Sequence, residues 1–379
     1  MDKSVVIAGF KRSPHHFANK GDLRRVRPDD LVAEVIKALV AETKVDPEAI
    51  EDLILGCAFP EGEQGFNMAR MVVFLAGLPQ SVGGVTVNRY CGSSMQAIHQ
   101  AAGAIQLGAG EAFLCAGVES MTRVPMMGFN PAPNPKLAAE MPQAYFNMGV
   151  TAENLAVKYQ ITRESQQDFA VRSQQRAAKA WAENRFAAEI VPIATKDGTV
   201  ERDGTIRPDT SQEGLSGLKP AFDQNGTVTA GTSSPLTDGA SATLVTSEAF
   251  AKAAGLPILA RIRSIAVSGC APEIMGIGPV GASRKALQRA GLSLQDIDVV
   301  ELNEAFAAQA LAVGRDLELD WDKTNIDGGA IALGHPLGAS GARITGKAAS
   351  ILKREGKALA LATMCIGGGQ GIATVLEAA

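Results

Sequence analysis

The sequence contains few cysteines, little excess charge and no long apolar run. Its five cysteines are an odd number without a C-x-x-C pair, which argues against a disulfide framework and favours free thiols in a reducing compartment. No set of ligands has the spacing of a zinc site, so no metal is expected. The 36 Lys+Arg against 40 Asp+Glu leave a net charge of -4, which excludes a protein that binds nucleic acid through a basic surface. Because no stretch of about 18 or more apolar residues occurs, no membrane span is predicted.

Hydrophobic residues are abundant, at 46% of the 379 positions, so the chain is not a disordered protein. Its length allows about two to three domains, each with its own core. The segment 5–9, Val-Val-Ile-Ala-Gly, predicts a strand that begins almost at once in place of a targeting segment, which favours a cytoplasmic location.

Short apolar runs alternate with helical patterns, which indicates an α/β fold. The runs are typical of strands buried on both faces. The helical patterns at 94–107 and 341–353 both open on Gly/Ser-rich turns, where backbone N–H groups and the positive end of a helix face a substrate. The predicted strands include 53–55, 112–114, 299–300 and 359–362.

Two parts of the sequence resemble each other. Residues 52–57 resemble 298–303, and 92–94 resemble 338–340 at the same spacing, which indicates a duplicated α/β half. Two such halves would pack about a pseudo-twofold axis with their corresponding loops facing one another. We therefore expect four side chains near one site: Cys91, Asn303, His335 and Cys365.

The composition changes between the two halves. Proline- and methionine-rich segments precede a predicted helix at 163–184, which suits an insertion laid over one half and does not continue a repeating sheet. An insertion without a functional role is the alternative. The predicted organisation is a first half at 1–120, an inserted loop domain at 121–232, a return to the first half at 233–255, and a second half at 256–379.

Cys91 lies between a predicted strand and a predicted helix. The helix N-terminus would lower the pKa of its thiol and make it a nucleophile, whereas the alternative is a small packed residue in a tight turn. Cys365 precedes three glycines, whose amides could form an oxyanion hole, although a glycine-rich turn with an incidental cysteine is equally compatible.

His335 is the best candidate for a base among four histidines, because glycines and a proline hold it on a rigid loop. His15 and His16 form a pair that looks mobile, and His99 is helical. Asn303 follows a predicted strand and leads into a helix, where it would ordinarily be an N-cap but could also orient a water molecule.

Four separated blocks match, in order, the motifs of the thiolase family. They are 88–94 (Asn-Arg-Tyr-Cys-Gly-Ser-Ser), 303–307 (Asn-Glu-Ala-Phe-Ala), 328–336 (Gly-Gly-Ala to Gly-His-Pro) and 365–369 (Cys-Ile-Gly-Gly-Gly). The chain resembles the degradative 3-ketoacyl-CoA thiolases over nearly its whole length. The resemblance implies paired βαβαβαββ halves in a layered α/β/α/β/α core, with an inserted loop domain that binds CoA.

The resemblance also implies a ping-pong acyl transfer. Cys91 would attack the 3-keto carbon and hold the shortened acyl group as a thioester until a second CoA collects it. His335 would activate Cys91, Asn303 would hold a water in the oxyanion hole of the departing enolate, and Cys365 would carry protons. The amides of Cys91 and Gly367 would stabilise the tetrahedral intermediates.

Acyl-CoA and CoA are the implied substrates, with no permanently bound cofactor. The resemblance places Arg207 at the phosphate end of CoA and Ser234 at its pantetheine portion. Met148, Met275 and Phe306 match positions that line the acyl and pantetheine tunnel, although each could be ordinary core.

Two positions depart from the family pattern. Asn147-Met148-Gly149 replaces the His-Met-Gly of the biosynthetic acetoacetyl-CoA thiolases, which disfavours that assignment. Asp327 replaces the usual asparagine before the histidine loop, and an ionised carboxylate there would raise the pKa of His335.

Several alternatives stay open. The nearest is a biosynthetic thiolase that runs the condensation, since the same residues serve both directions. A condensing ketoacyl synthase would lack Cys365, and a non-catalytic thiolase-like lipid-binding protein would be expected to have lost Cys91, His335 or Cys365. The family implies a homodimer or homotetramer. Some members also bind a hydratase/dehydrogenase subunit, for which no docking segment is recognisable here.

Overall fold

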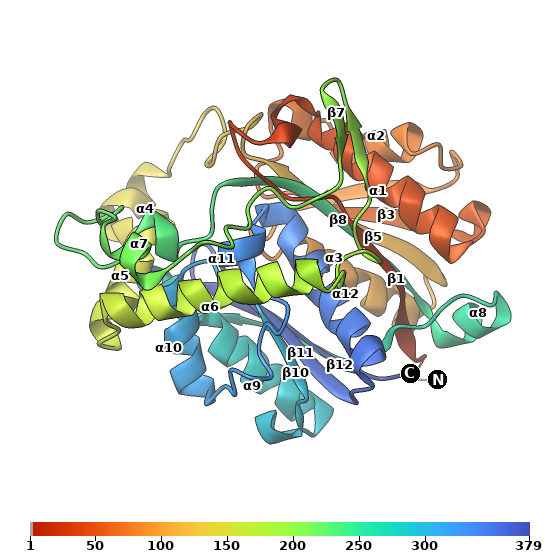
Figure 1. Ribbon diagram of the computed structural model, residues 1–379. Coiled ribbons are helices and arrows are strands. Elements are labelled where there is room, and N and C mark those ends of the chain that lie inside the picture. Colours follow the sequence, from red (N-terminus) through yellow and green to blue (C-terminus); the bar gives the residue numbers. More distant parts are fainter. Residues whose placement is uncertain (1–2) are drawn as a thin grey trace.

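The computed structural model describes residues 3–379 and contains one large mixed sheet (Figure 1). Along this sheet the strands follow the order β10-β11-β12-β9-β1-β8-β5-β3-β4, with β2 paired to β8. The strands of the sheet are β1 (Val5–Arg12), β2 (His16–Phe17), β3 (Asp52–Gly56), β4 (Gly83–Val87), β5 (Ala112–Ser120), β8 (Thr237–Ser247), β9 (Ala260–Gly269), β10 (Val299–Leu302), β11 (Leu359–Ile366) and β12 (Gln370–Glu377).

The two halves of the sheet have the same topology. In the first half β3 runs parallel to β5, which is antiparallel to β8 and through it to β1. In the second half β10 runs parallel to β11, which is antiparallel to β12 and through it to β9. A single parallel bridge between Val300 and Thr324 stands where the first half has β4. The predicted duplication of an α/β half is therefore confirmed.

Helices cover both faces of this sheet and fill the space between its halves (Figure 1). Outside the first half, α1 packs on β5 and β8 while α2 packs on β3 and β4. The helix α9 packs on β9, β11 and β12 outside the second half, next to α10. Between the halves, α12 touches strands of both and packs on α3, which gives the expected α/β/α/β/α layering. These helices are α1 (Pro28–Thr43), α2 (Met68–Leu75), α3 (Ser93–Leu107), α9 (Gly278–Ala290), α10 (Ala307–Leu317) and α12 (Leu337–Glu355).

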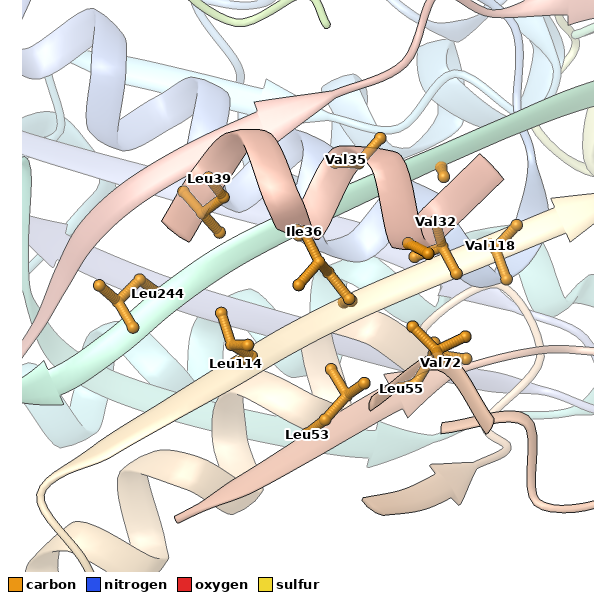
Figure 2. Close-up of a cluster of buried hydrophobic side chains, with 14 of the residues drawn as sticks. Val32, Val35, Ile36, Leu39, Leu53, Leu55, Val72, Leu114, Val118 and Leu244 are labelled. Carbon is orange, nitrogen blue, oxygen red and sulfur yellow. The ribbon is translucent and has the colours of Figure 1, made fainter. Parts of the chain in front are cut away.

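The outer layer of the first half shows why these segments form these elements. Figure 2 shows Val32, Ile36 and Leu39 of α1 pointing at the sheet, at the three- and four-residue spacing of one helix face. Leu53 and Leu55 of β3 alternate with residues on the opposite face and meet these side chains. Burial of this face stabilises the layer by removing apolar surface from water.

The middle helices approach each other and the sheet closely at glycines. A Cβ atom at Gly341 of α12 would lie 2.3 Å from the backbone nitrogen of Met95 in α3. At Gly117 of β5 a Cβ atom would lie 2.0 Å from the carbonyl oxygen of Gly338, so the start of α12 rests directly on β5. Only glycine fits these contacts, and they set the position of both helix N-termini.

The segment between β5 and β8 contains the helices α4 (Pro135–Glu140), α5 (Met148–Lys158), α6 (Arg163–Ala182) and α7 (Gln212–Ser216), and the hairpin β6 (Ile193–Thr195) and β7 (Gly198–Val200). The helix α6 matches the predicted helix at 163–184 and packs on α10 and on α11 (Ala330–Leu333). Ile193 and Val200 join the core of the first half, so the hairpin belongs with that half in packing. A short α8 (Glu248–Ala253) follows β8. Within residues 3–379, no helix has the length and apolarity needed to cross a membrane.

Candidate active site

The N-termini of α3 and α12 meet the carboxyl ends of β10 and β11, and the predicted site residues lie there. Cys91 stands between β4 and α3, and His335 stands between α11 and α12. Asn303 directly follows β10, where its N–H donates to the Thr363 carbonyl of β11 at 3.0 Å. Cys365 lies near the end of β11, and Gly367 is the first residue after Ile366 ends that strand.

Cys91 faces the second half of the molecule. The backbone N–H groups of Gly367 and of Cys91 itself point at the Cys91 sulfur and favour its thiolate, but burial outweighs them and raises the pKa of Cys91 to about 12. The expectation that the helix N-terminus lowers this pKa is therefore wrong for the free protein. The reason is that Cys91 packs against two apolar clusters, and these remove water from the thiol.

Hydrogen bonds determine which nitrogen of His335 carries the proton. The Ser340 hydroxyl donates to the Pro336 carbonyl at 3.0 Å, so it accepts from His335 Nδ1 at 2.6 Å. Nδ1 therefore carries the hydrogen and Nε2 carries the lone pair. Burial lowers the pKa of His335 to about 3, with a further contribution from Arg343. The ring is neutral, and its Nε2 lone pair lies on the side of Asn303.

Asn303 is a partner of His335 and not a helix cap. Its Nδ2 lies 3.3 Å from His335 Nε2, whereas the next helix, α10, begins only at Ala307 with Phe306 as its N-cap. The Asn303 Oδ1 atom is buried and has no hydrogen-bond partner among the described residues. A buried amide oxygen without a partner suits a bound water or a substrate group.

Cys365 is buried near the other thiol. Burial raises the pKa of Cys365 well above its ordinary value, and the neighbouring Cys91 and Cys270 thiols raise it further. The side chain belongs to an apolar cluster that also contains the predicted tunnel residues Met148, Met275 and Phe306.

The predicted tunnel residues lie close to the loop that follows β11. The Met148 sulfur lies 3.5 Å from the position of a Cβ at Gly367. Ser234 is held beside the same cluster, because its hydroxyl donates to the Ala305 carbonyl at 3.0 Å. Sequence reasoning missed Phe222, whose ring meets Phe306 edge-on at 5.8 Å between centroids. Phe222 lies on a loop whose sequence has no helical or strand periodicity, so no sequence pattern identified it.

Arg207 is an arginine without a carboxylate partner among the described residues. It is partly buried, its Nε has no hydrogen-bond partner there, and burial lowers its pKa. Its guanidinium lies 5.9 Å from the centroid of the Phe17 ring. A partly buried guanidinium of this kind favours an incoming anion.

Two expectations about other polar residues are wrong. Asp327 does not act on His335, because its buried carboxylate pairs with Lys347 at 2.8 Å, Arg354 at 2.7 Å and Arg185 at 3.1 Å. The pair His15 and His16, interpreted as mobile, is buried.

Ser340 is a second residue that the sequence analysis did not identify. Its place in the first turn of the helix after His335 was the signal that could have identified it.

Comparison with known proteins identifies the family and the fold. The family model "Thiolase, N-terminal domain" matches residues 5–249, and "Thiolase, C-terminal domain" matches residues 256–378. The chain belongs to the thiolase family. Its thiolase halves are similar over their full length to the 3-ketoacyl-CoA thiolases of Shewanella loihica, at 54% identity with 100% of both chains covered, and of Shewanella sp. strain ANA-3, at 53% identity with 99% of both covered.

Solved structures show the same thiolase architecture. The crystal structure of human mitochondrial 3-ketoacyl-CoA thiolase in complex with CoA matches with a TM-score of 0.92 and 41% identity, covering 100% of this chain and 98% of that one. A second crystal structure of human mitochondrial 3-ketoacyl-CoA thiolase matches with a TM-score of 0.91 and 41% identity, covering 100% of this chain and 99% of that one. The thiolase fold and the resemblance to 3-ketoacyl-CoA thiolases, both expected from the sequence, are confirmed.

Proposed function

We propose that this thiolase cleaves 3-ketoacyl-CoA with CoA to give acetyl-CoA and a shortened acyl-CoA. The observation that carries this proposal is the pair of neighbouring thiols, Cys91 and Cys365, with the Gly367 amide pointing at the Cys91 sulfur and an apolar cluster beside Cys365. A Claisen cleavage needs a nucleophile, a separate proton carrier and donors for two carbonyl oxygens, and this site contains each of them.

In the first half-reaction Cys91 attacks the 3-keto carbon, and His335 Nε2 accepts the thiol proton. The C2–C3 bond then breaks, the electron pair goes to the acetyl-CoA enolate, and Cys365 delivers a proton to its carbon. In the second half-reaction Cys365 takes the proton of the incoming CoA thiol, whose sulfur attacks the thioester and releases the Cys91 thiolate. That thiolate takes back the proton held on His335 Nε2. Each catalytic thiol ends protonated, as it began.

Cys91 and His335 are both neutral in the protein without substrate. With the pKa of Cys91 raised to about 12 and that of His335 lowered to about 3, proton transfer between them is unfavourable in the free protein. A substrate oxygen accepting from the amides of Cys91 and Gly367 carries the negative charge once the sulfur attacks, so the pair ionises as the acyl bond forms. Asn303, through its unpartnered Oδ1, holds the water that donates to the enolate oxygen.

Arg207 supplies the contact for a CoA phosphate, and Ser234 together with Phe222 and Met148 borders the pantetheine arm. The support for this assignment is the absence of a carboxylate partner for Arg207 among the described residues and the clustering of the apolar groups around Cys365. Met275 and Phe306 line the acyl chain in the same cluster.

We also propose that the enzyme works in β-oxidation, in the cytoplasm, as a homodimer or a dimer of dimers. The edge strand β4 carries Val85 at 40% exposure, and Phe66 and Phe74 nearby are 92% and 48% exposed. An edge strand with exposed apolar side chains beside it favours pairing with another chain, and a second copy offers the matching edge. Gel filtration with light scattering tests the oligomeric state. A monomer at micromolar concentration would contradict the proposed dimer.

Steady-state thiolysis of acetoacetyl-CoA and of 3-ketoacyl-CoAs of increasing chain length tests the activity. We expect CoA-dependent cleavage, with an acetyl group trapped on Cys91 when acetyl-CoA is given alone. Cys57→Ser is the matched control for Cys91→Ser, because Cys57 is a buried cysteine of the same half that lies outside the tunnel cluster. Equal losses in the two variants, or an adduct on Cys365, would refute the roles proposed for the thiols.

Preference for condensation over cleavage would favour the biosynthetic alternative. That outcome is measured as the ratio of the two rates at equal CoA concentrations. Tight acyl-CoA binding without turnover of any chain length would favour a lipid-binding protein and would exclude the enzyme.

A further inference from the structure

His15 is a buried histidine outside the motifs of the family, and it contacts the loop that carries His335. Its side chain has no exposed surface, and Nδ1 lies 3.0 Å from the carbonyl oxygen of Leu333. Gly239 of β8 separates its ring from Pro336, because a Cβ there would lie 2.4 Å from His15 Cδ2 and 3.0 Å from Pro336 Cγ. His15 therefore bonds the residue just before the Gly334–His335 dipeptide and lies on the same side of the loop as Pro336.

The protonation of His15 follows from its partner. A carbonyl oxygen can only accept, so Nδ1 donates to Leu333 and Nε2 carries a lone pair. Nε2 is buried and has no hydrogen-bond partner among the described residues. Burial, with Arg12 close by, lowers the pKa of His15 to about 3, so the ring stays neutral throughout the working range of an enzyme.

The loop around His335 is also held by strand β8. Gly334 has φ of 84°, a conformation that side chains rarely adopt, so the backbone turns sharply just before His335. The N–H of His335 donates to Thr237 Oγ1 at 3.0 Å, and Thr237 lies on β8 two residues before Gly239. Thr237 thus binds the N–H of His335, while His15 binds the carbonyl oxygen of Leu333.

His15 is itself fixed by a buried ionic network. Its N–H donates to Asp203 Oδ1 at 2.8 Å, and Arg12 binds the two oxygens of Asp203 at 2.7 and 2.9 Å. Arg12 also binds Glu189 at 2.7 Å, so the network anchors β1 to the segment inserted between β5 and β8. Because this network holds His15 rigidly and His15 is neutral, His15 is suited to fixing the position of a neighbouring loop and not to exchanging protons.

We propose that His15 is a positioning residue that holds the Leu333–Pro336 turn and thereby aims His335 Nε2 at the Cys91 thiol. This inference rests on the proposed thiolase function. His15 touches neither Cys91 nor the tunnel cluster, so it acts through His335. Its donor at Nδ1 is the necessary feature, and an asparagine at this position reproduces that donor whereas phenylalanine or glutamine does not.

The test compares His15→Phe and His15→Gln with His15→Asn. We expect His15→Phe and His15→Gln to lower kcat for thiolysis by about 10-fold to 100-fold with little change in KM, because a small misplacement of a catalytic group has that effect. His15→Asn should restore kcat to within about threefold of the unsubstituted chain. The second readout is alkylation of Cys91 by iodoacetamide across pH, which needs no substrate. It should be slower at neutral pH in His15→Phe and His15→Gln and normal in His15→Asn.

His99→Phe is the matched control. His99 is also a buried histidine with its pKa lowered to about 3 and one hydrogen bond, to Thr374 at 2.8 Å, but it lies on α3 and does not contact the His335 loop. We expect it to lose thermal stability while keeping kcat and the alkylation profile. If His15→Phe fails to fold, His15→Gln carries the comparison.

The proposal would be overturned if His15→Gln had the same kcat and alkylation profile as the unsubstituted chain. It would also be overturned if His15→Asn lost as much kcat as His15→Gln. Failure of the proposed function is distinguishable, because it would appear as no thiolysis by the unsubstituted chain. In that case the alkylation profile alone still decides the role of His15.

Discussion

His335 Nδ1 and Ser340 Oγ form a buried hydrogen bond of 2.6 Å within the first turn of α12. The bond selects the tautomer in which Nε2 is the free base, because the Ser340 hydrogen is already given to the Pro336 carbonyl. The first turn of α12 therefore orients the histidine that precedes this helix.

Ser340→Ala should lower kcat by about 10-fold to 100-fold with little change in KM, because a small misplacement of the His335 ring has an effect of this order. Ser350→Ala is the control, since the Ser350 hydroxyl also donates four residues back on α12, to Gly346 at 2.9 Å. Steady-state thiolysis of both variants is the measurement. If Ser340→Ala retains the kcat of the control, the orientation of His335 does not depend on Ser340.

Gly341→Ala should both destabilise the protein and reduce its activity. The added methyl would lie 2.3 Å from the backbone of Met95, so α3 and α12 must separate, at a cost of about 1–3 kcal/mol. Because Cys91 and His335 precede these two helices, their separation increases too. The control Gly103→Ala on α3 has open space around its Cβ and should stabilise by about 0.5–1 kcal/mol. Urea unfolding of the two variants measures these changes in the free energy of unfolding, which we expect to have opposite signs.

Much of the fold could be predicted from local patterns. The apolar runs at 53–55 and 359–362 became β3 and β11 because buried parallel strands need continuous apolar sequence. The internal repeat was readable because both halves keep a strand followed by a glycine-rich turn and a middle helix. Asn303 and His335 came together as expected, because both lie on loops of the second half, after β10 and before α12.

What could not be predicted depended on contacts between distant positions. The pKa of Cys91 is decided by desolvation from apolar clusters assembled from both halves, whereas its sequence shows only a nearby helix start. His15 looked like part of a mobile polar pair because Arg12 and Asp203, which bury it, are 191 positions apart. A single sequence shows neither the packing density around a thiol nor such long-range ion pairs.

Glu301→Gln should change how stability depends on pH. Burial raises the pKa of Glu301 to about 8, from 4.5, although Arg343 and Lys347 act to lower it. The folded protein therefore binds this proton more tightly than the unfolded chain. The stability that this proton contributes is fully present below about pH 4.5 and is lost as pH rises to about 8.

A glutamine at position 301 does not titrate. The free energy of unfolding of Glu301→Gln, minus that of the unsubstituted chain, should therefore increase between pH 5 and pH 8, by a few kcal/mol at about 1.4 kcal/mol per unit. Urea unfolding at several pH values measures this difference. A difference that stays constant with pH would show that Glu301 is ionised in both states.

Asp327→Asn tests the ionic cluster behind the histidine loop. Burial acts to raise the pKa of Asp327, but the ion pairs with Lys347 and Arg354 outweigh it, and the pKa is lowered. The asparagine variant would leave the nearly buried Lys347 with Glu189 as its remaining partner, so we expect a loss of about 3 kcal/mol at neutral pH. The sign follows from the lowered pKa. The contribution of Asp327 is present above its unfolded pKa of about 3.8 and is lost as pH falls through the folded value.

The same variant separates stability from catalysis. Since the Asp327 carboxylate is neutralised by three cations and does not act on His335, the pH–rate profile of thiolysis should match that of the unsubstituted chain. Urea unfolding at neutral and acidic pH, beside kcat/KM across pH, measures both quantities. A profile shifted to lower pH in Asp327→Asn would mean that the carboxylate raises the pKa of His335 after all, and the three ion pairs would then not screen it.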